Sequence, residues 1–159
     1  MAEPSSRKSI CKNRKAHFQY SIEETVEAGL VLTGSEVKSL RAGGANLVDS
    51  YAQVRGTEIF LHKAHIAPYV HAGNGNHLPA RTRKLLLHRR EIHRLGGRLR
   101  ERGLTLVPIE MYWKNGRAKV ELGLGRGKKM HDKRHSIAER ESDRRLRQVT
   151  RRHAKRGGE

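Results

Sequence analysis

The last 34 residues of the chain contain too little apolar surface to form a hydrophobic core. Residues 126–159 hold 13 Lys and Arg against 5 Asp and Glu, and they include no Phe, Tyr or Trp. Their only sizeable apolar side chains are Met130, Ile137, Leu146 and Val149. Burial of so few groups does not offset the conformational entropy that is lost on ordering. We therefore expect residues 126–159 to be a basic C-terminal tail that is disordered when free.

This tail nevertheless has a composition that favours helix. Residues 136–155 contain no Gly or Pro and are rich in Arg, Glu and Ala. Ser136 and Glu139 have the spacing of a capping box. We expect a helix over 136–155 to form when the positive charge of the tail meets phosphate. The alternative is a solvated basic tail that only improves solubility.

The whole chain is strongly basic, with a formal net charge of +18 over 159 residues. A protein with this charge repels itself, which indicates a polyanionic partner. No apolar run approaches the roughly 18 residues of a membrane span, and the first ten residues lack the apolar core of a signal peptide. The single Cys11 cannot form an internal disulfide. We expect a cytoplasmic monomer that contacts no membrane.

Residues 13–125 have the pattern of a small β-rich domain, and residues 1–12 that of a basic flexible arm. Strands are predicted at 18–22, 30–32, 50–55, 58–66, 105–113 and 117–124, and helices at 36–41 and 86–102. Two helices are too few for a parallel, doubly wound sheet. We therefore expect a mainly β fold with short helices, a small antiparallel barrel like the oligonucleotide-binding fold. A ferredoxin-like sheet with two helices is the alternative.

Two local signals support these elements. Thr33 and Glu36 have the spacing of a capping box, which places a helix start before residue 36. Asn115-Gly116 is the dipeptide preferred in two-residue hairpin turns, so it predicts a hairpin between the last two strands.

Neither catalysis nor metal binding is indicated by the motifs of the chain. No nucleophile elbow, Walker loop or zinc-protease motif is present in the sequence. His131 and His135 can share a helix face, but no further ligand pair completes a tetrahedral zinc site. The glycines at 123, 125 and 127 lack the spacing of a phosphate loop, and we interpret them as a hinge before the tail. We expect no enzyme activity, no cofactor and no metal.

RNA is the polyanion that the composition favours. Lys and Arg supply affinity through the release of counterions from phosphates. The chain has only 2 Phe, 4 Tyr and 1 Trp, which is few for a protein that binds single strands by stacking alone. Recognition of RNA shape and phosphate positions, with a few specific contacts, is the interpretation that remains.

Long segments of the chain resemble one family in the same order. They are Asn13-Arg14-Lys15-Ala16 and residues 27–43, 45–52, 65–69, 83–92, 103–108, 114–117, 119–123 and 127–134. This pattern, which covers about residues 12–140, resembles the small protein B family, the SsrA-binding proteins of bacterial trans-translation. The resemblance implies an oligonucleotide-binding-fold barrel that binds the tRNA-like domain of transfer-messenger RNA and delivers it to stalled ribosomes. It also implies that the tail enters the decoding centre and the empty message channel as a helix, without catalysis.

The resemblance also implies the residues that contact RNA. On the barrel, Asn13, Glu27, Tyr51 and Lys119 match RNA-facing positions, and their plausible neighbours are Arg14, Lys15, Tyr20, Glu36, Arg41 and Lys84. A Glu that faces RNA is reasonable because a carboxylate accepts hydrogen bonds from base amino groups. The alternative for Glu27 is a local bond within a strand, and the alternative for Tyr51 is a position in the core.

The tail residues that match the ribosome-engaging segment are Lys128, Lys129, His131, Asp132, Lys133 and Arg134. His131 can stack on an unpaired base, whereas charge attraction alone would not select Asp132.

Two other functions remain open. One is a ribosomal or ribosome-assembly protein bound permanently to ribosomal RNA, and the other is an RNA-modifying enzyme.

Overall fold

The computed structural model describes residues 6–101 and 103–156, with side chains up to residue 151. The chain divides into two compact units, Met1–Gly127 and Lys128–Glu159. The predicted boundary after residue 125 is two residues early, because the last strand of the first unit continues to Gly127. The predicted arm, second helix and tail each include positions outside the described residues, namely 1–5, Arg102 and 157–159.

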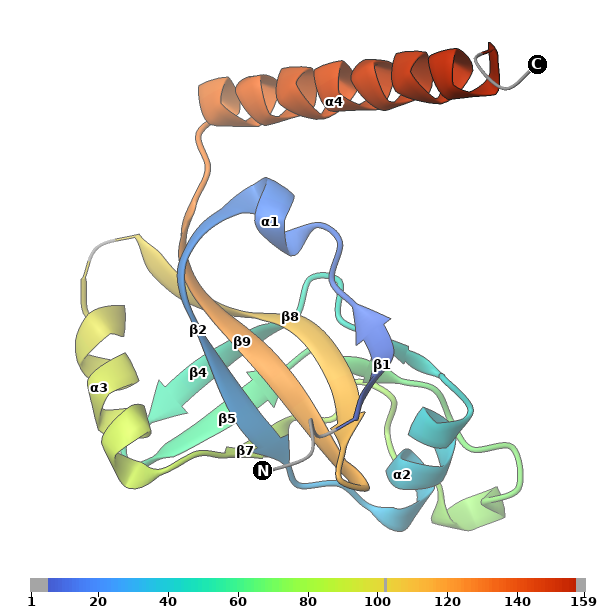
Figure 1. Ribbon diagram of the computed structural model, residues 1–159. Helices are drawn as coiled ribbons and strands as arrows, with labels where there is room; N and C mark the ends of the chain where they lie inside the picture. The colour runs from blue at the N-terminus through green and yellow to red at the C-terminus, as the bar shows by residue number, and fades with distance from the viewer. Residues whose placement is uncertain (1–5, 102, 157–159) are drawn as a thin grey trace, which may run out of the picture. The chain divides into compact units, whose positions relative to one another are not determined.

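The first unit is a closed antiparallel barrel. Its sheet contains β1 (Arg7–Lys12), β2 (Tyr20–Leu30), β4 (Tyr51–Arg55), β5 (Glu58–His62), β7 (Arg83–Leu86), β8 (Leu104–Lys114) and β9 (Arg117–Gly127). The strand order is β1-β8-β4-β5-β7-β2-β9, and β8 also pairs with β9. Six strands therefore form a ring, and β1 is added to the outside edge of β8 (Figure 1). A short second sheet pairs β3 (Ala45–Asn46) with β6 (His65–Ile66).

This ring confirms the prediction of a mainly β, oligonucleotide-binding-fold-like barrel and excludes the ferredoxin-like alternative. Alternate residues of its strands fill the interior. Ile59, Leu61, Leu106, Val120 and Leu122 all have exposed fractions of zero. Burial of these side chains supplies the main stabilising free energy of the barrel.

Four helices and one 3₁₀ turn complete the described residues. They are α1 (Ala16–Gln19), α2 (Gly34–Arg41), η1 (Gly73–Gly75), α3 (Arg89–Leu99) and α4 (Met130–Arg156). The capping box of α2 is present, since the backbone N–H of Thr33 donates to Glu36 at 3.4 Å. No helix among the described residues is long and apolar enough to cross a membrane.

The final hairpin follows the prediction closely. Asn115 and Gly116 have φ values of 51° and 74°, the left-handed conformation that the tight turn requires. β9 runs beyond its predicted end at residue 124 to Gly127.

Several predicted elements are wrong in their bounds. Phe18 lies in α1, and the two strands predicted at 18–22 and 30–32 are one strand, β2, with a register shift between Ile22 and Glu24. Residues 83–86 form β7 between β5 and β2, so α3 begins at Arg89 and not at residue 86. His88 acts as its N-cap, and His is not among the residues that usually mark a helix start.

The predicted flexible arm is also wrong for residues 7–12. They form β1, which pairs with residues 110–114 of β8 through a register shift between Ser9 and Cys11. Arg7–Lys12 shows no alternation of apolar and polar residues, so only its pairing with a distant strand reveals it as a strand.

Two of the three glycines before the tail, Gly123 and Gly125, are not a hinge. Gly123 and Gly125 are buried in β9 between β2 and β8. A Cβ atom on Gly125 would lie 2.6 Å from the carbonyl oxygen of Ser21, and one on Gly123 would lie 2.7 Å from Cδ1 of Ile109. Close strand packing therefore accounts for Gly123 and Gly125. Gly127 is exposed with no atom near its Cβ position, and the packing does not test its part in the predicted hinge.

The second unit contains one long helix. α4 begins at Met130, six residues before the predicted start. The hydroxyl of Ser136 accepts a hydrogen bond from Lys128 Nζ at 3.1 Å, so it does not cap a helix start as predicted. The helical state is the one expected for the bound tail, whereas disorder of the free tail stays a prediction.

Candidate RNA interface

Glu27 lies on the outer face of β2 and is the centre of a polar cluster. Its carboxylate accepts a hydrogen bond from the phenol of Tyr112 and two from Lys114 Nζ, both at 3.2 Å. Partial burial alone would raise the pKa of Glu27, but these hydrogen bonds and the nearby charge of Lys119 lower it. The carboxylate is 37% exposed, so it remains ionised and accessible to a ligand.

Tyr112 is held in place from the other side by the first strand. The guanidinium of Arg7 lies 3.7 Å from the centre of the Tyr112 ring and also pairs with Glu110 and Glu121. Burial and the carboxylate of Glu27 raise the pKa of Tyr112, so its hydroxyl stays a donor. The arrangement leaves Glu27 as an acceptor with lone pairs to spare.

A groove of about 460 Å³ opens beside Glu27. It is lined by Glu27, Gly29, Leu86, Leu87, His88, Glu91 and Lys119. Leu86 is 54% exposed there, which gives the groove an apolar side. An apolar side next to an acceptor and a cation suits a nucleotide base and its phosphate.

Glu36, a predicted neighbour of this surface, is instead completely buried. It forms ion pairs with Arg83, which is also fully buried, and with Arg81 at 2.5 Å. Burial alone would raise the pKa of Glu36, but the hydrogen bonds from the two guanidinium groups lower it. Glu36 therefore joins α2 to β7 inside the unit and does not lie on its surface.

Asn13 is also buried, with an exposed fraction of 7%. Its side-chain amide donates to the carbonyl oxygens of Leu47 and Pro108, at 3.3 and 3.0 Å. These bonds connect the chain after β1 to two other segments, and they give Asn13 a structural function here.

The remaining predicted barrel residues lie on several different elements of the unit. Arg14, Lys15 and Arg41 are exposed, and Tyr20 is half-buried at the start of β2. Lys84 lies on β7, where it pairs with Glu58 at 2.8 Å. Tyr51 lies on β4, 37% exposed and stacked on His62, so it is not a core residue. The structure brings Glu27 and Lys119 together and places Tyr51 and Lys84 on other strands.

The partly exposed carboxylates of Glu23 and Glu24 pair with arginines. Glu23 contacts Arg98 and Arg126 at 2.8 and 3.1 Å, and Glu24 pairs with Arg94. These exposed pairs reduce the number of α3 arginines that are available to phosphates.

In the second unit, the predicted ribosome-engaging residues lie at the start of α4 and just before it. His131 and Asp132 are exposed, with Nδ1 and Oδ1 3.9 Å apart. Lys129, Lys133 and Arg134 lie in the same segment, and Lys128 contacts Ser136. Asp132 is an acidic residue in the first turn of a helix, where it complements the helix dipole.

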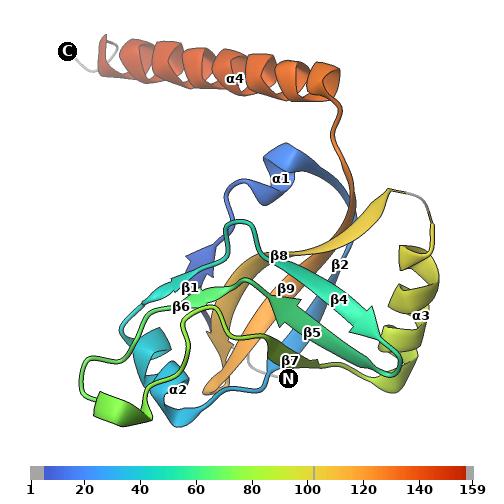
Figure 2. The same ribbon diagram turned by 180° about the vertical axis from the view of Figure 1, so that it is seen from behind.

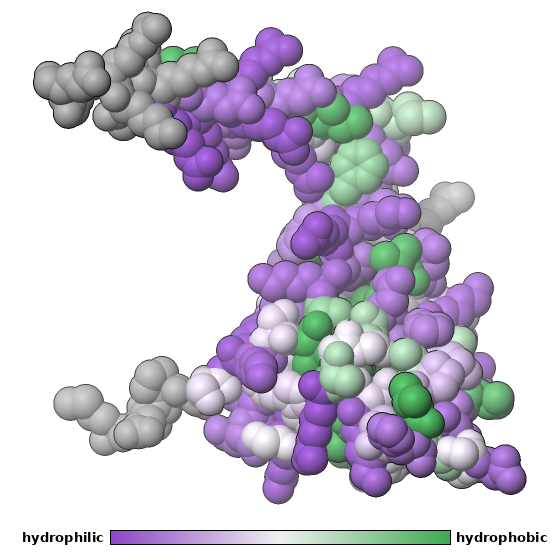
Figure 3. All heavy atoms as spheres, turned by 90° about the vertical axis from the view of Figure 1, so that its right-hand side faces the viewer, coloured by the Kyte–Doolittle hydropathy of each residue, from purple (hydrophilic) through white to green (hydrophobic). Residues whose placement is uncertain are grey.

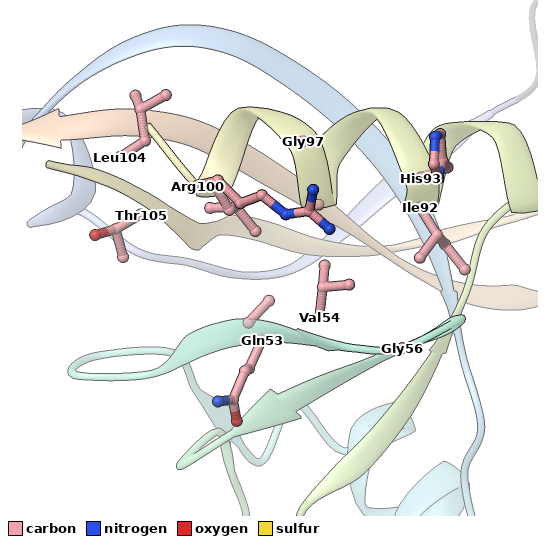
Figure 4. A pocket seen from close by; sticks show the side chains of 12 residues that line it. Gln53, Val54, Gly56, Ile92, His93, Gly97, Arg100, Leu104 and Thr105 are labelled. Atoms are coloured by element: carbon pink, nitrogen blue, oxygen red, sulfur yellow. The ribbon is translucent and has the colours of Figure 1, made fainter. Parts of the chain in front are cut away.

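A larger groove, of about 510 Å³, lies between α3 and β4 (Figure 4). Val54 and Ile92 point into it, and the guanidinium of Arg100 extends along the underside of α3 near Gly97. Its lining contains no carboxylate or thiol. Across the described residues, no group of three or more His, Cys, Asp or Glu side chains is arranged to hold a metal ion.

One face of the molecule is drawn in Figure 3. Hydrophilic residues cover most of it, and hydrophobic residues form small separate patches. This face therefore lacks the broad apolar area that typifies a stable protein–protein interface.

Sequence reasoning missed three residues of the Glu27 cluster, namely Arg7, Tyr112 and Lys114. Tyr112 and Lys114 lie within or next to segments that resemble the family, so that likeness was the available signal. Arg7 gave none, because its contact with Tyr112 depends on the pairing of β1 with β8.

A closed basic barrel with an acceptor-and-cation groove, followed by a basic helix, is typical of an RNA-binding protein. Comparisons with known proteins agree with this class. A family model described as "SmpB protein" matches residues 10–152. The chain belongs to the SmpB family.

Individual relatives are similar over nearly the full chain. The SsrA-binding protein of Thermobifida fusca is 57% identical over 145 residues, 91% of either chain. That of Frankia casuarinae is 52% identical over 155 residues, 98% of either chain. A solved chain described as "tmRNA-SmpB: a journey to the center of the bacterial ribosome" has a TM-score of 0.65 and 49% identity, covering 76% of this chain and 85% of its own.

Proposed function

We propose that this protein is the RNA-binding adaptor of trans-translation, which binds transfer-messenger RNA and brings it to stalled ribosomes. Family membership and the likeness to SsrA-binding proteins support this function. The observation that supports the site is the carboxylate of Glu27, held ionised by Tyr112 and Lys114 at the mouth of a groove that Lys119 also lines.

On the barrel, Glu27 accepts a hydrogen bond from a base amino or imino group, and Lys119 contacts a phosphate. Arg14, Lys15 and Arg41 are exposed cations that add phosphate contacts elsewhere on the same unit. The protein acts by positioning RNA, so no step of the function needs a nucleophile or a metal. Its place of action is the ribosome, which corresponds to a cytoplasmic protein.

The tail engages the ribosome through Lys128, Lys129, His131, Asp132, Lys133 and Arg134. α4 is a basic helix from Met130 to Arg156, a form that suits a channel lined by phosphate. Its apolar side chains Ile137, Leu146 and Val149 are exposed. The helix thus has few packing partners of its own, in agreement with a segment that is stabilised by its binding site.

A truncation tests this division between barrel and tail. A chain that ends after Gly127 keeps every strand of the barrel. We expect it to bind transfer-messenger RNA as tightly as the full chain and to lose peptide tagging on stalled ribosomes. Loss of RNA binding by the truncated chain would contradict the division.

Substitutions in the groove test the barrel site itself. We expect Glu27→Gln and Lys119→Gln each to weaken transfer-messenger RNA binding in the full chain, whereas Thr57→Ala, at the exposed β4–β5 turn, leaves it unchanged.

Sequencing of the RNA that copurifies with the protein separates the adaptor function from the alternative of a ribosomal protein. One dominant small RNA supports the adaptor, and stoichiometric ribosomal RNA would indicate a permanent ribosomal protein.

A further inference from the structure

The outer face of the β4–β5 hairpin carries an aromatic surface made of Tyr51, Phe60 and His62. Residues of this hairpin alternate between its two faces. Ala52, Ile59 and Leu61 point into the core, with exposed fractions of 6%, 0% and 0%. Tyr51, Phe60 and His62 therefore lie on the opposite face, where each is at least partly exposed.

The rings of this aromatic surface are arranged for stacking. Tyr51 is directly opposite His62 across the two strands, with ring centres 5.1 Å apart and planes inclined by 21°. Tyr51 remains 37% exposed, so the pair has an accessible ring face. Burial and the charge of Arg55 lower the pKa of His62, so its imidazole is neutral near pH 7 and acts as a flat ring rather than a cation. Its Nε2 atom is buried without a hydrogen-bond partner among the described residues.

Cations flank the aromatic surface on two strands. The guanidinium of Arg55 lies 5.9 Å from the centre of the Phe60 ring. Lys84 is directly opposite Phe60 on β7 and shares its charge with Glu58. Rings between cations are the elements with which proteins bind unpaired nucleotides, because the rings stack on bases while the cations approach the phosphates.

The position of this surface in the barrel separates it from the Glu27 groove. In the six-stranded ring, β5 and β9 are three strands apart in either direction. Figure 1 shows β2 and β9 in front of β4 and β5, and Figure 2 shows the reverse. Tyr51 on β4 is likewise three strands from Glu27 on β2. The groove does reach Leu86 on β7, next to β5, but at the level of the β4–β5 turn, whereas the Tyr51–His62 pair lies at the opposite end of the hairpin. The Tyr51–His62 end of the aromatic surface is therefore the part that lies farthest from the Glu27 groove.

We infer that Tyr51, His62 and Phe60 form a stacking site for an unpaired nucleotide of ribosomal RNA. This inference rests on the proposed function, since it takes the ribosome as the second partner. It moves Tyr51 from the interface with transfer-messenger RNA to the interface with the ribosome, and it adds Phe60 and His62 as contact residues.

The test uses the full chain and two separate binding measurements. Tyr51→Ala and His62→Ala are compared with the wild type and with Thr57→Ala, an exposed position at the turn of the same hairpin. Binding of transfer-messenger RNA alone is measured first, and binding of the preformed RNA complex to ribosomes second. We expect unchanged affinity in the first measurement. In the second, we expect each Ala variant to bind about 5- to 150-fold more weakly, which corresponds to loss of one stacked base.

Two further readouts distinguish stacking from charge attraction. Tyr51→Phe keeps the ring and should bind ribosomes like the wild type. The ratio of the Tyr51→Ala and wild-type dissociation constants should stay constant as salt rises, because stacking releases no counterions. Ultraviolet crosslinks from the hairpin, mapped by primer extension, should fall on ribosomal RNA.

Three results would overturn the inference. Unchanged ribosome binding by Tyr51→Ala and His62→Ala would exclude stacking. Equal losses in Tyr51→Phe and Tyr51→Ala would assign the effect to the hydroxyl and not to the ring. Weaker binding to transfer-messenger RNA alone would return Tyr51 to that interface. Failure of the proposed function is recognised separately, as failure of the wild type to bind transfer-messenger RNA.

Discussion

The phenol of Tyr112 on β8 donates a hydrogen bond to the carboxylate of Glu27 on β2, across the intervening strand β9. Because burial and Glu27 raise the pKa of Tyr112, this hydroxyl remains a donor at every working pH. The bond fixes the position of the Glu27 carboxylate, and Glu27 lines the groove. Tyr112, although only 1% exposed, thereby influences what the exposed Glu27 can bind.

Removal of this hydroxyl should weaken RNA binding. We expect Tyr112→Phe to reduce the affinity for transfer-messenger RNA about 10-fold, since a hydrogen bond to a charged group contributes about 1.5–3 kcal/mol. The loss should be smaller in a Glu27→Gln background, because both changes remove the same interaction. A double-mutant cycle of dissociation constants measures this coupling. Tyr69→Phe is the control, because it removes a phenol hydroxyl from a residue that does not line the groove.

The pH dependence of RNA binding provides a second readout of Tyr112. Hydrogen bonds from Tyr112 and Lys114 lower the pKa of Glu27, so binding through its ionised form is lost only when the pH falls through that lowered value. Without the phenol, the pKa of Glu27 rises. We therefore expect the acid loss of binding to begin at a higher pH in Tyr112→Phe. An unshifted profile would mean that Tyr112 only supports the barrel.

Substitutions that break the buried ion pair of Glu36 with Arg83 should lower the free energy of unfolding strongly. Glu36→Gln leaves the fully buried guanidinium of Arg83 without its carboxylate, which should cost about 3–5 kcal/mol of unfolding free energy. The double change Glu36→Leu with Arg83→Met removes both charges and should cost less than the single one. Urea unfolding followed by circular dichroism compares them. A larger loss in the double variant would contradict this account.

Acid should destabilise the wild type through the same pair. Because the pKa of Glu36 is lower in the folded state, its contribution is fully present above the unfolded value and declines as pH falls through the folded value. Glu36→Gln has no such group. We expect the difference in stability between wild type and Glu36→Gln to be largest near neutral pH and to shrink in acid. Unfolding curves at a series of pH values check this.

The parts of the fold that the sequence predicted are those with local causes. The turn at Asn115-Gly116 and the cap at Thr33 and Glu36 depend on residues a few positions apart. β1 and β7 were missed because their pairing involves strands far away in the sequence. A ring of strands also has two sides, and family likeness names important residues without saying which side each one faces. The resemblance grouped Tyr51 with Glu27, and the structure places them on β4 and β2, three strands apart in the ring.

The burial of Glu36, which the resemblance put beside the RNA-facing residues, could not be predicted for the same reason. Burial of its carboxylate becomes reasonable only with two arginines in reach. Those arginines lie 45 and 47 residues later in the chain. Charge pattern alone cannot reveal such a pair.

The glycines of β9 should differ in their tolerance of a methyl group. In Gly125→Ala the new Cβ meets the backbone of Ser21, which cannot move without disturbing β2, so we expect a loss of about 1–3 kcal/mol or more. Gly123→Ala meets the ends of Ile109 and Ile22, which can shift, so its cost should be smaller. Gly127→Ala has nothing within 4 Å and should be neutral. Melting temperatures measure the order. Equally small changes in melting temperature at the three positions would support the interpretation of these glycines as a hinge.

The two RNA contacts of the protein should respond differently to salt. Each phosphate contact contributes about −0.7 to −0.9 to the slope of log binding constant against log salt. Replacement of Lys128, Lys129, Lys133 and Arg134 by Gln in the full chain should therefore make the slope for ribosome binding less negative by about 3. The slope for transfer-messenger RNA alone should stay unchanged, because the Glu27 groove lies in the other unit. Titrations at several salt concentrations, with Gln148→Ala as a control on α4, measure both slopes. Equal changes in the two slopes would show that the tail also binds transfer-messenger RNA.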